Sequence, residues 1–212
     1  MKKIMIILLS FAVIAAMMSI FSCGNNNPEQ PAPTNTPTKT PTTVPSVGPT
    51  PVPSIANYNF TDDQTTDWYL GVDSAFSNLT YNTTEGHNAA GCMQVTGDFS
   101  SSGAKGEVQR NLGTATDFTG RKITAWINIP ADLVDATHPY GVQFFVQDST
   151  WGWDAQWINI ASSGWQKYEW VLPGSLNQNI TQIVKVGIQI SAGTGSPTVA
   201  NPVTILFDDI TW

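Results

Sequence analysis

Tryptophan is concentrated in one short segment of this 212-residue sequence. Five of the eight tryptophans lie close together, at Trp151, Trp153, Trp157, Trp165 and Trp170. Glutamine, asparagine and lysine residues occur on both sides of the segment. Flat aromatic rings stack on the apolar C–H faces of sugar rings, and amide or charged side chains bind sugar hydroxyl groups. The combination predicts a binding surface for a neutral, hydroxyl-rich ligand.

Three of these tryptophans are expected to contact ligand. Trp151 and Trp153 lie in a glycine-containing break between two expected strands, where a large ring is difficult to bury. Trp157 alternates with Ile158 and Ile160, so it faces away from the core if the two isoleucines face toward it. The alternative is that these rings pack over one end of the fold.

The other tryptophans are assigned differently. Trp165 and Trp170 lie in the strand-like segment 164–172 and are expected in the core. The pair Trp68-Tyr69, in an N-terminal loop, is a reserve candidate for ligand contact.

Alternation of apolar and polar residues predicts an all-β domain. Period-two patterns occur over residues 123–129, 141–147 and 184–190, and turn motifs with glycine or proline separate them. Many short strands with such breaks indicate a β-sandwich of the jelly-roll type. Helical signals are confined to single turns near residues 130–133 and 174–177.

The same alternation predicts which side chains share the exposed face of a sheet. If Val142, Phe144 and Val146 face the core, their neighbours face the opposite side. The expected polar and aromatic set on that side is Gln143, Gln147, Trp157, Asn159, Lys185 and Gln189. Gly187, among them, is expected to leave room for a sugar ring to lie flat on the backbone.

Residues for catalysis are sparse. Asp148, Asp154 and Glu169 are close to the aromatic segment, but the carboxylate pattern typical of β-sandwich glucanases is missing. His87 and His138 have no partner at a metal-binding spacing, so neither a zinc site nor a Cys–His nucleophile is indicated. We therefore expect a binding protein with no catalytic residues, and a hydrolase built on the aspartates is the least favoured alternative.

The N-terminus resembles the signal of a bacterial lipoprotein. Lys2 and Lys3 precede an apolar run over residues 4–20, and Ile20-Phe21-Ser22-Cys23 is similar to a lipobox. This pattern predicts a signal peptide over residues 1–22 and lipidation of Cys23. The alternatives are an ordinary signal peptide cut near Ser22 and an uncleaved transmembrane helix, for which the apolar run is short. We expect a lipid-anchored protein exposed at the surface of the bacterial cell envelope.

Composition predicts the organisation of the remaining chain. Residues 23–54 comprise the lipidated cysteine and a linker rich in proline and threonine, and residues 55–212 have the size of one domain. Without Lys2 and Lys3 the chain has seven basic and sixteen acidic residues, a net charge of −9, which makes nucleic acid a poor partner. Cys92, the second cysteine, is expected to be a small buried hydrophobic residue.

Four landmarks resemble the jelly-roll carbohydrate-binding modules of bacterial cellulases, mannanases and related hydrolases, within the galactose-binding-like β-sandwich superfamily. They are the segments 57–63, 117–123, 164–168 and 205–212. The resemblance implies noncatalytic binding of a polysaccharide of the β-glucan or mannan type, with separate polysaccharide-degrading enzymes as expected partners. The alternative on the same fold is an envelope domain that binds a protein.

The resemblance also implies a structural calcium ion that joins the first strand to the last. The matching positions are Asp62 or Asp63 near the start and Asp208 near the end. Calcium requires several oxygen ligands, which carboxylates and backbone carbonyls supply. The family usually has an acid directly after the opening phenylalanine, and Thr61 stands at that position here.

Overall fold

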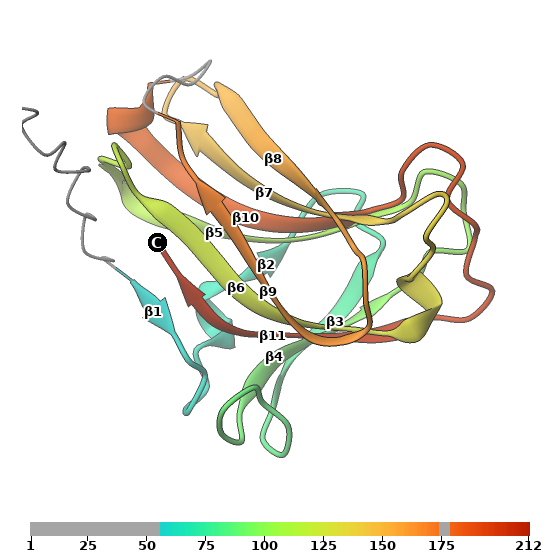
Figure 1. Cartoon of the computed structure of the whole chain (residues 1–212). Coiled ribbons are helices and arrows are strands. Elements are labelled where there is room, and N and C mark those ends of the chain that lie inside the picture. The colour runs from blue at the N-terminus through green and yellow to red at the C-terminus, as the bar shows by residue number, and fades with distance from the viewer. Residues whose placement is uncertain (1–55, 174–178) are drawn as a thin grey trace, which may run out of the picture. The chain divides into compact units, whose positions relative to one another are not determined.

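The computed structural model describes residues 56–173 and 179–212, which form β-strands and short 3-10 helices (Figure 1). The first strands are β1 (Asn57–Tyr58), β2 (Tyr69–Leu70), β3 (Phe76–Asn82), β4 (Cys92–Gly97), β5 (Lys105–Thr116) and β6 (Lys122–Ile129). The later strands are β7 (Gly141–Asp148), β8 (Trp153–Asn159), β9 (Gly164–Val171), β10 (Ile183–Ser191) and β11 (Val203–Thr211). The helices are η1 (Thr65–Asp67), η2 (Ala131–Leu133) and η3 (Ile180–Gln182). Within the described residues, no helix has the length and hydropathy needed to cross a bilayer.

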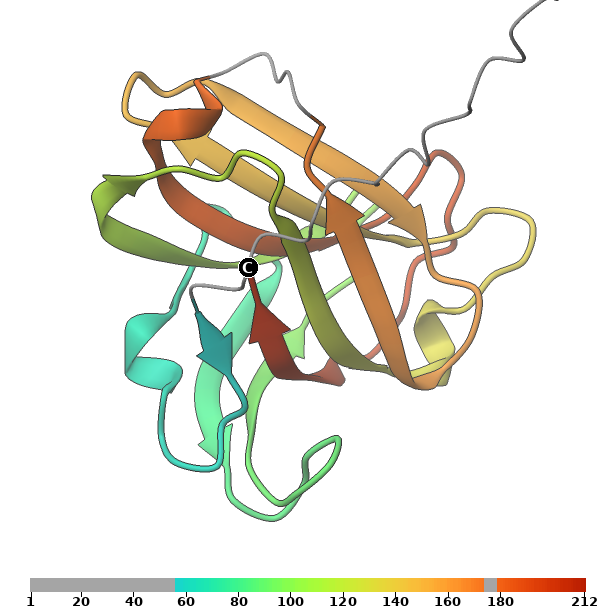
Figure 2. The same cartoon turned by 60° about the vertical axis from the view of Figure 1, so that its left-hand side comes forward.

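The strands form two antiparallel sheets that pack against each other (Figures 1 and 2). Sheet A has the order β3-β4-β11-β6-β9, and β1 also pairs with β11. Sheet B has the order β2-β5-β10-β7-β8. In Figure 1, β7, β8 and β10 lie above β4 and β11. The predicted β-sandwich is confirmed.

The core lies between the sheets, where the inward side chains of alternating strands meet. Ile123, Ala125 and Ile127 are buried on β6, and Val142 and Phe144 are buried on β7. The three strands predicted from alternation correspond to β6, β7 and β10. Alternation therefore identified three strands that each have a paired neighbour on both sides.

The buried thiol and the short helices agree with the sequence where they are described. Cys92 is fully buried, and burial raises the pKa of its thiol to about 12, which makes it an unreactive hydrophobic residue at neutral pH. Helix η2 matches the turn predicted near residues 130–133. The turn predicted at 174–177 lies outside the described residues.

One strand departs from simple alternation. The register of β10 shifts between Ile183 and Lys185. Ile183 therefore takes the buried position, and Val184 is half-buried and lines a surface pocket beside Lys185. The period-two pattern over residues 184–190 predicts that Val184 faces the core, and the bulge explains why this prediction is wrong.

Trp68 belongs to the core, so its reserve role as a ligand contact was wrong. Its ring makes edge contacts with Tyr58 at 5.6 Å and with Trp212 at 6.2 Å between centroids. The guanidinium carbon of Arg110 lies 4.7 Å from the centre of the Tyr58 ring, and its Nη1 atom is 2.9 Å from Asp67 Oδ2. This aromatic cluster joins the start of the domain to the end of its last strand.

Candidate functional site

Sheet B presents its outer face as three rows of side chains, because its strands pair in a fixed register. The first row contains Trp157, Gln143, Gln189 and Glu107. The middle row contains Ala155, Phe145, Gly187, Gln109 and Tyr69. The third row contains Trp153, Gln147, Lys185 and Asn111.

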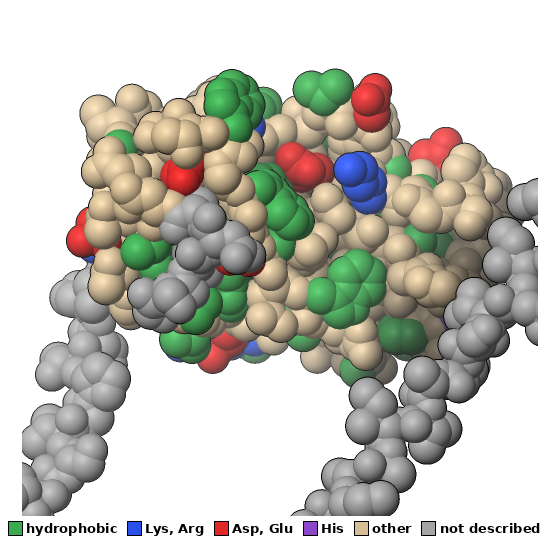
Figure 3. Space-filling view, turned by 90° about the horizontal axis from the view of Figure 1, so that it is seen from above, with side chains coloured by type: hydrophobic (Ala, Val, Ile, Leu, Met, Phe, Trp, Pro, Cys, Tyr) green, Lys and Arg blue, Asp and Glu red, His purple; other side chains and the backbone are tan. Residues whose placement is uncertain are grey.

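This outer face brings together nearly the whole predicted ligand-contacting set. Asn159, opposite Gly141, extends the face beyond the first row, and only Trp151 lies apart, in the turn next to the third row. Seen from above the view of Figure 1, hydrophobic side chains lie apart from one another among polar ones, with acidic and basic groups between them (Figure 3). The surface therefore combines separated apolar patches with polar surroundings.

Phe145 of the middle row and Trp153 of the third row stack on each other. Their ring centroids are 6.0 Å apart and their planes differ by 30°. Phe145 is only 2% exposed, whereas Trp153 is 47% exposed. A Cβ atom on Gly187 would lie 2.1 Å from Phe145 Cζ, so the Phe145 ring fills the space above this glycine. The prediction that Gly187 leaves room for a sugar ring was wrong, and the available apolar surface is Trp153.

Trp157 forms a second aromatic surface at the other end of the same strand. Its indole lies against Gly141, where a Cβ atom would be 2.2 Å from Trp157 Cε2. The indole Nε1 donates a hydrogen bond to Asn159 Oδ1 at 2.7 Å. Trp157 and Asn159 line a pocket of about 470 Å³ together with His138 and Gly193. This pocket places an aromatic edge and an amide beside each other.

The polar part of the face includes an amide pair and a carboxylate. Gln189 Nε2 donates to Gln143 Oε1 at 3.1 Å. Each carboxamide carries both a donor and an acceptor, so the pair can also bind hydroxyl groups. Burial raises the pKa of the neighbouring Glu107, an effect opposed by the positive charges of Lys105 and Lys185.

Four residues of β2 and β5 complete the face: Tyr69, Glu107, Gln109 and Asn111. Tyr69 belongs to the reserve pair Trp68-Tyr69, and the three residues of β5 were not predicted. The Tyr69 hydroxyl donates to Asn111 Oδ1 at 2.6 Å. Alternation along β5 contains the necessary signal, but Gly106 and Arg110 stand at inward positions and interrupt its apolar series.

Trp151 lies in the turn between β7 and β8 and is 78% exposed. Its φ of 70° places the backbone in the left-handed region, which costs an L-residue other than glycine roughly 1–2 kcal/mol. The Asp148 carboxylate holds the turn: Oδ1 accepts from the Thr150 N–H, the Thr150 hydroxyl and the Gly152 N–H, each at 2.8 Å. Oδ2 accepts from the Asn179 N–H at 2.9 Å. These hydrogen bonds lower the pKa of Asp148 to about 2, and the bond from the Asn179 N–H has the largest effect.

The carboxylates near the aromatic segment do not form a pair suited to glycoside hydrolysis. Asp148 accepts three hydrogen bonds from the turn and one from Asn179. Glu169 lies on β9 of the other sheet, where its Oε2 is 3.1 Å from Lys122 Nζ and 2.8 Å from Lys167 Nζ. Asp154 accepts from the Ala155 N–H at 2.8 Å. Two carboxylates that flank one glycosidic bond must face each other across it, and Asp148 and Glu169 do not.

The two remaining tryptophans of the segment occupy different environments. Trp170 is 5% exposed in the core, as predicted. Trp165 is half-buried beside His87, at 5.9 Å between ring centroids, so its prediction as a core residue was wrong. It lies an odd number of residues from Tyr168, which is buried in the core, and alternation therefore places it on the opposite face of β9.

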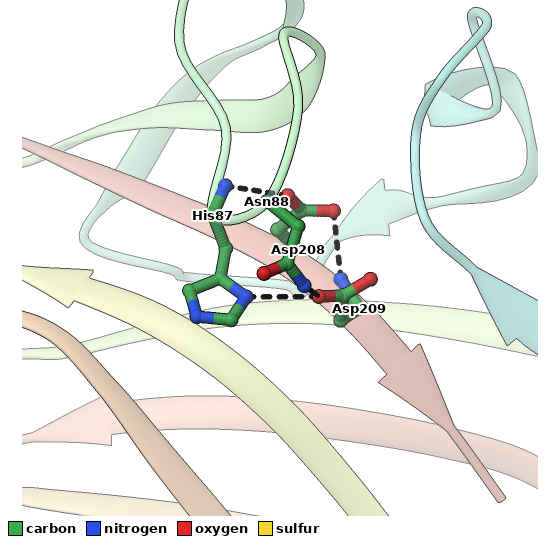
Figure 4. Close-up of polar contacts among 4 residues, drawn as sticks. All are labelled: His87, Asn88, Asp208 and Asp209. Atoms are coloured by element: carbon green, nitrogen blue, oxygen red, sulfur yellow. Dashed lines mark hydrogen bonds and ion pairs between the residues drawn. The ribbon is translucent and has the colours of Figure 1, made fainter.

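The loop between β3 and β4 is joined to the last strand by a polar cluster (Figure 4). The His87 N–H donates to Asp208 Oδ2 at 2.7 Å, and the ring Nδ1 is 3.0 Å from Asp209 Oδ2. Asn88 Nδ2 also donates to Asp209 Oδ2, at 2.7 Å. The His87 ring stacks on Trp126, at 3.6 Å between centroids and 16° between planes. We call His87, Asn88, Asp208 and Asp209 the His87 clasp.

The surroundings of Asp208 do not fit a calcium ion. Calcium takes about six to eight oxygen ligands, but the Asp208 oxygens accept N–H groups of His87 and Asp209, each at 2.7 Å. Asp63 Oδ1 accepts from the N–H and hydroxyl of Thr65. No group of three His, Cys, Asp or Glu side chains within residues 56–173 and 179–212 could hold a metal ion. Asp62, Asp63 and Asp208 are not brought together as a ligand group, so these residues do not fit the calcium site that the resemblance implies.

The His87 clasp predicts a measurable stability pattern. We expect a chelator to leave the melting temperature of the full chain unchanged, because N–H groups and not a cation satisfy Asp208. His87→Ala is expected to lower the unfolding free energy by about 1–2 kcal/mol through loss of the ring stack and one hydrogen bond. Thermal melts with chelator, with added Ca²⁺ and for the variant measure both effects. A melting temperature that falls with chelator and returns with Ca²⁺ would contradict this account.

Comparison with solved structures identifies proteins of similar fold. No protein-family model matches the sequence, and no curated protein matches it. A carbohydrate-binding module of the β-sandwich superfamily, described for its promiscuous specificity, superimposes with a TM-score of 0.53 at 18% identity, over 73% of this chain and 60% of that one. A CBM28 module specific for non-crystalline cellulose gives 0.51 at 15% identity, over 72% and 91%.

The described residues therefore have the β-sandwich fold of jelly-roll carbohydrate-binding modules. This agrees with the resemblance found in the sequence landmarks.

Proposed function

We propose that this domain binds a polysaccharide without cleaving it, along the outer face of sheet B. One observation carries the proposal: Trp153 and Trp157 lie on the same face of β8, beside the Gln143–Gln189 amide pair. Sugars require flat apolar surface for their C–H faces together with donors and acceptors for their hydroxyl groups. The face supplies both, and the separation of its aromatic rings by polar groups argues against a flat protein-binding patch.

A neutral polymer of the β-glucan or mannan type fits this face best. The first and third rows are four residues apart on β7, which is about 13 Å at the usual strand rise, so the face suits several consecutive sugar units. The charged groups around this face are Glu107 and the two lysines that act on it, Lys105 and Lys185. They do not form the cluster of basic groups that an acidic polymer requires. The similar CBM28 module is specific for non-crystalline cellulose, which supports a glucan.

The N-terminal signal supports a surface-displayed lipoprotein. Cys23 and the linker lie outside the described residues, so their role follows from sequence alone. Lipid on Cys23 would anchor the protein, and the proline-rich linker would hold the domain away from the membrane. In this arrangement the domain captures polysaccharide for separate degrading enzymes.

Native affinity electrophoresis tests the proposed function. The full chain in detergent is run through gels that contain a β-glucan, a mannan or a xylan, beside a reference protein that binds none of them. Retardation by the glucan or the mannan is the expected result. Free migration of the folded protein in every gel would contradict polysaccharide binding and favour an envelope protein-interaction role.

A further inference from the structure

We propose that the turn over residues 148–152 presents Trp151 as a third stacking surface for the polysaccharide, and that Asp148 is its positioning residue. The inference rests on the proposed function, because it extends the same face beyond its third row. It assigns a purpose to a strained tryptophan and to a buried carboxylate that the rest of the fold leaves unexplained.

Asp148 fixes two separate segments of the chain with one side chain. It is 4% exposed, and it accepts three hydrogen bonds from the turn and one from Asn179, which precedes η3. A backbone bond from the Ser149 N–H to the Gln182 carbonyl, at 3.2 Å, runs between the same two segments. Because buried hydrogen bonds to a carboxylate are strong and directional, the turn has one defined conformation.

Trp151 is not explained by packing or by local backbone preference. Its ring is largely exposed, so it contributes little to the core, and its left-handed backbone favours glycine or asparagine at this position. Backbone strain of this kind persists where the surrounding structure enforces it, often at functional sites. The strain and the exposure both point to a surface that is kept for a ligand.

The surroundings of Trp151 suit a sugar unit. A pocket of about 250 Å³ is lined by Trp151, Tyr69, Asn111, Gln147 and Lys185. Lys185 Nζ lies 5.9 Å from the centre of a Trp151 ring. A sugar that stacks on Trp151 would therefore have an ammonium group and an amide within reach of its hydroxyls. A polymer that already covers Trp153 would reach this pocket with its next units.

Trp151→Gly distinguishes the effect of the ring on ligand binding from its effect on stability. Glycine relieves the left-handed strain, so the melting temperature is expected to stay equal or rise. Affinity for long oligosaccharides of the retarding polymer is expected to fall by about fivefold, with no change for oligosaccharides too short to extend past Trp153. Val171→Ala is the matched control, because Val171 is 66% exposed on β9 of the other sheet. That control is expected to bind like the parent chain.

Asp148→Asn tests the positioning role. The asparagine side chain accepts hydrogen bonds at Oδ1 but not at its NH₂ group, so it cannot hold both the turn and the Asn179 N–H, and the turn loosens. Affinity for long oligosaccharides should therefore fall as in Trp151→Gly, while short ones bind normally. The double variant should bind like Trp151→Gly alone, because both changes remove the same contact.

Three results would overturn the inference. Parent-like affinity of Trp151→Gly for long oligosaccharides excludes the third surface, even if Trp153 variants fail to bind and the proposed function stands. Equal weakening of short and long ligands by Asp148→Asn shows a general structural role and excludes a positioning role. Absence of binding by the parent chain removes the proposed function and this inference together.

Discussion

Trp153→Ala is expected to weaken polysaccharide binding by about tenfold or more. Full burial of a large apolar side chain contributes about 1.5–3 kcal/mol, and about 1.4 kcal/mol corresponds to a factor of ten in affinity. Roughly half of the Trp153 surface is available to ligand, and its stacking on Phe145 holds the ring in a defined orientation before binding. Isothermal titration calorimetry with the retarding polysaccharide measures the loss.

The control variants identify the cause of this loss. Trp153→Phe keeps an aromatic face and is expected to retain most of the affinity, and the exposed Val171 on the opposite sheet again provides a neutral substitution. The unfolding free energy of Trp153→Ala should change by about 1 kcal/mol or less, since the ring is not in the core. Unchanged affinity would exclude Trp153 from the site, and a large loss of stability would place it in the core.

Gly187→Ala is expected to lower both stability and affinity. The added Cβ would lie 2.1 Å from Phe145 Cζ, so Phe145 must move and carry Trp153 with it. Overpacking of this kind costs about 1–3 kcal/mol, which lowers the melting temperature of a domain this size by several degrees. Thermal melts and calorimetry measure the two effects.

A double-mutant cycle with Phe145→Ala tests whether that contact is responsible. Phe145→Ala removes the three atoms nearest to the added Cβ. In that background Gly187→Ala should cost much less stability than in the parent chain. A cost for Gly187→Ala that is the same in both backgrounds would refute the Phe145 contact as the cause.

The sequence predicts the strands well because one buried face imposes a period of two. The patterns at 123–129 and 141–147 coincide with β6 and β7, and the outward positions Gln143, Gln147 and Lys185 lie on one face as expected. Alternation failed at Val184, where a bulge in β10 changes the side on which the residue lies. Period-two patterns thus predict faces only while the register is regular.

Contacts between distant segments were not accessible to the sequence. The His87 clasp joins residues 121 or 122 positions apart, and no local pattern indicates it. The Phe145 ring above Gly187 depends on the pairing of β7 with β10, which alternation within one strand does not reveal. The Trp165 prediction failed for a simpler reason, since its parity relative to Tyr168 already places it on the outer face.

Tryptophan indole NMR during titration with an oligosaccharide of the retarding polymer tests the central claim most directly. We expect the Nε1–H signals of Trp153 and Trp157 to shift, because both rings lie on the outer face of sheet B. The signals of the core residues Trp68 and Trp170 should stay in place. Shifts confined to Trp126 and Trp165, on the outer face of sheet A, would contradict the assignment of the binding face.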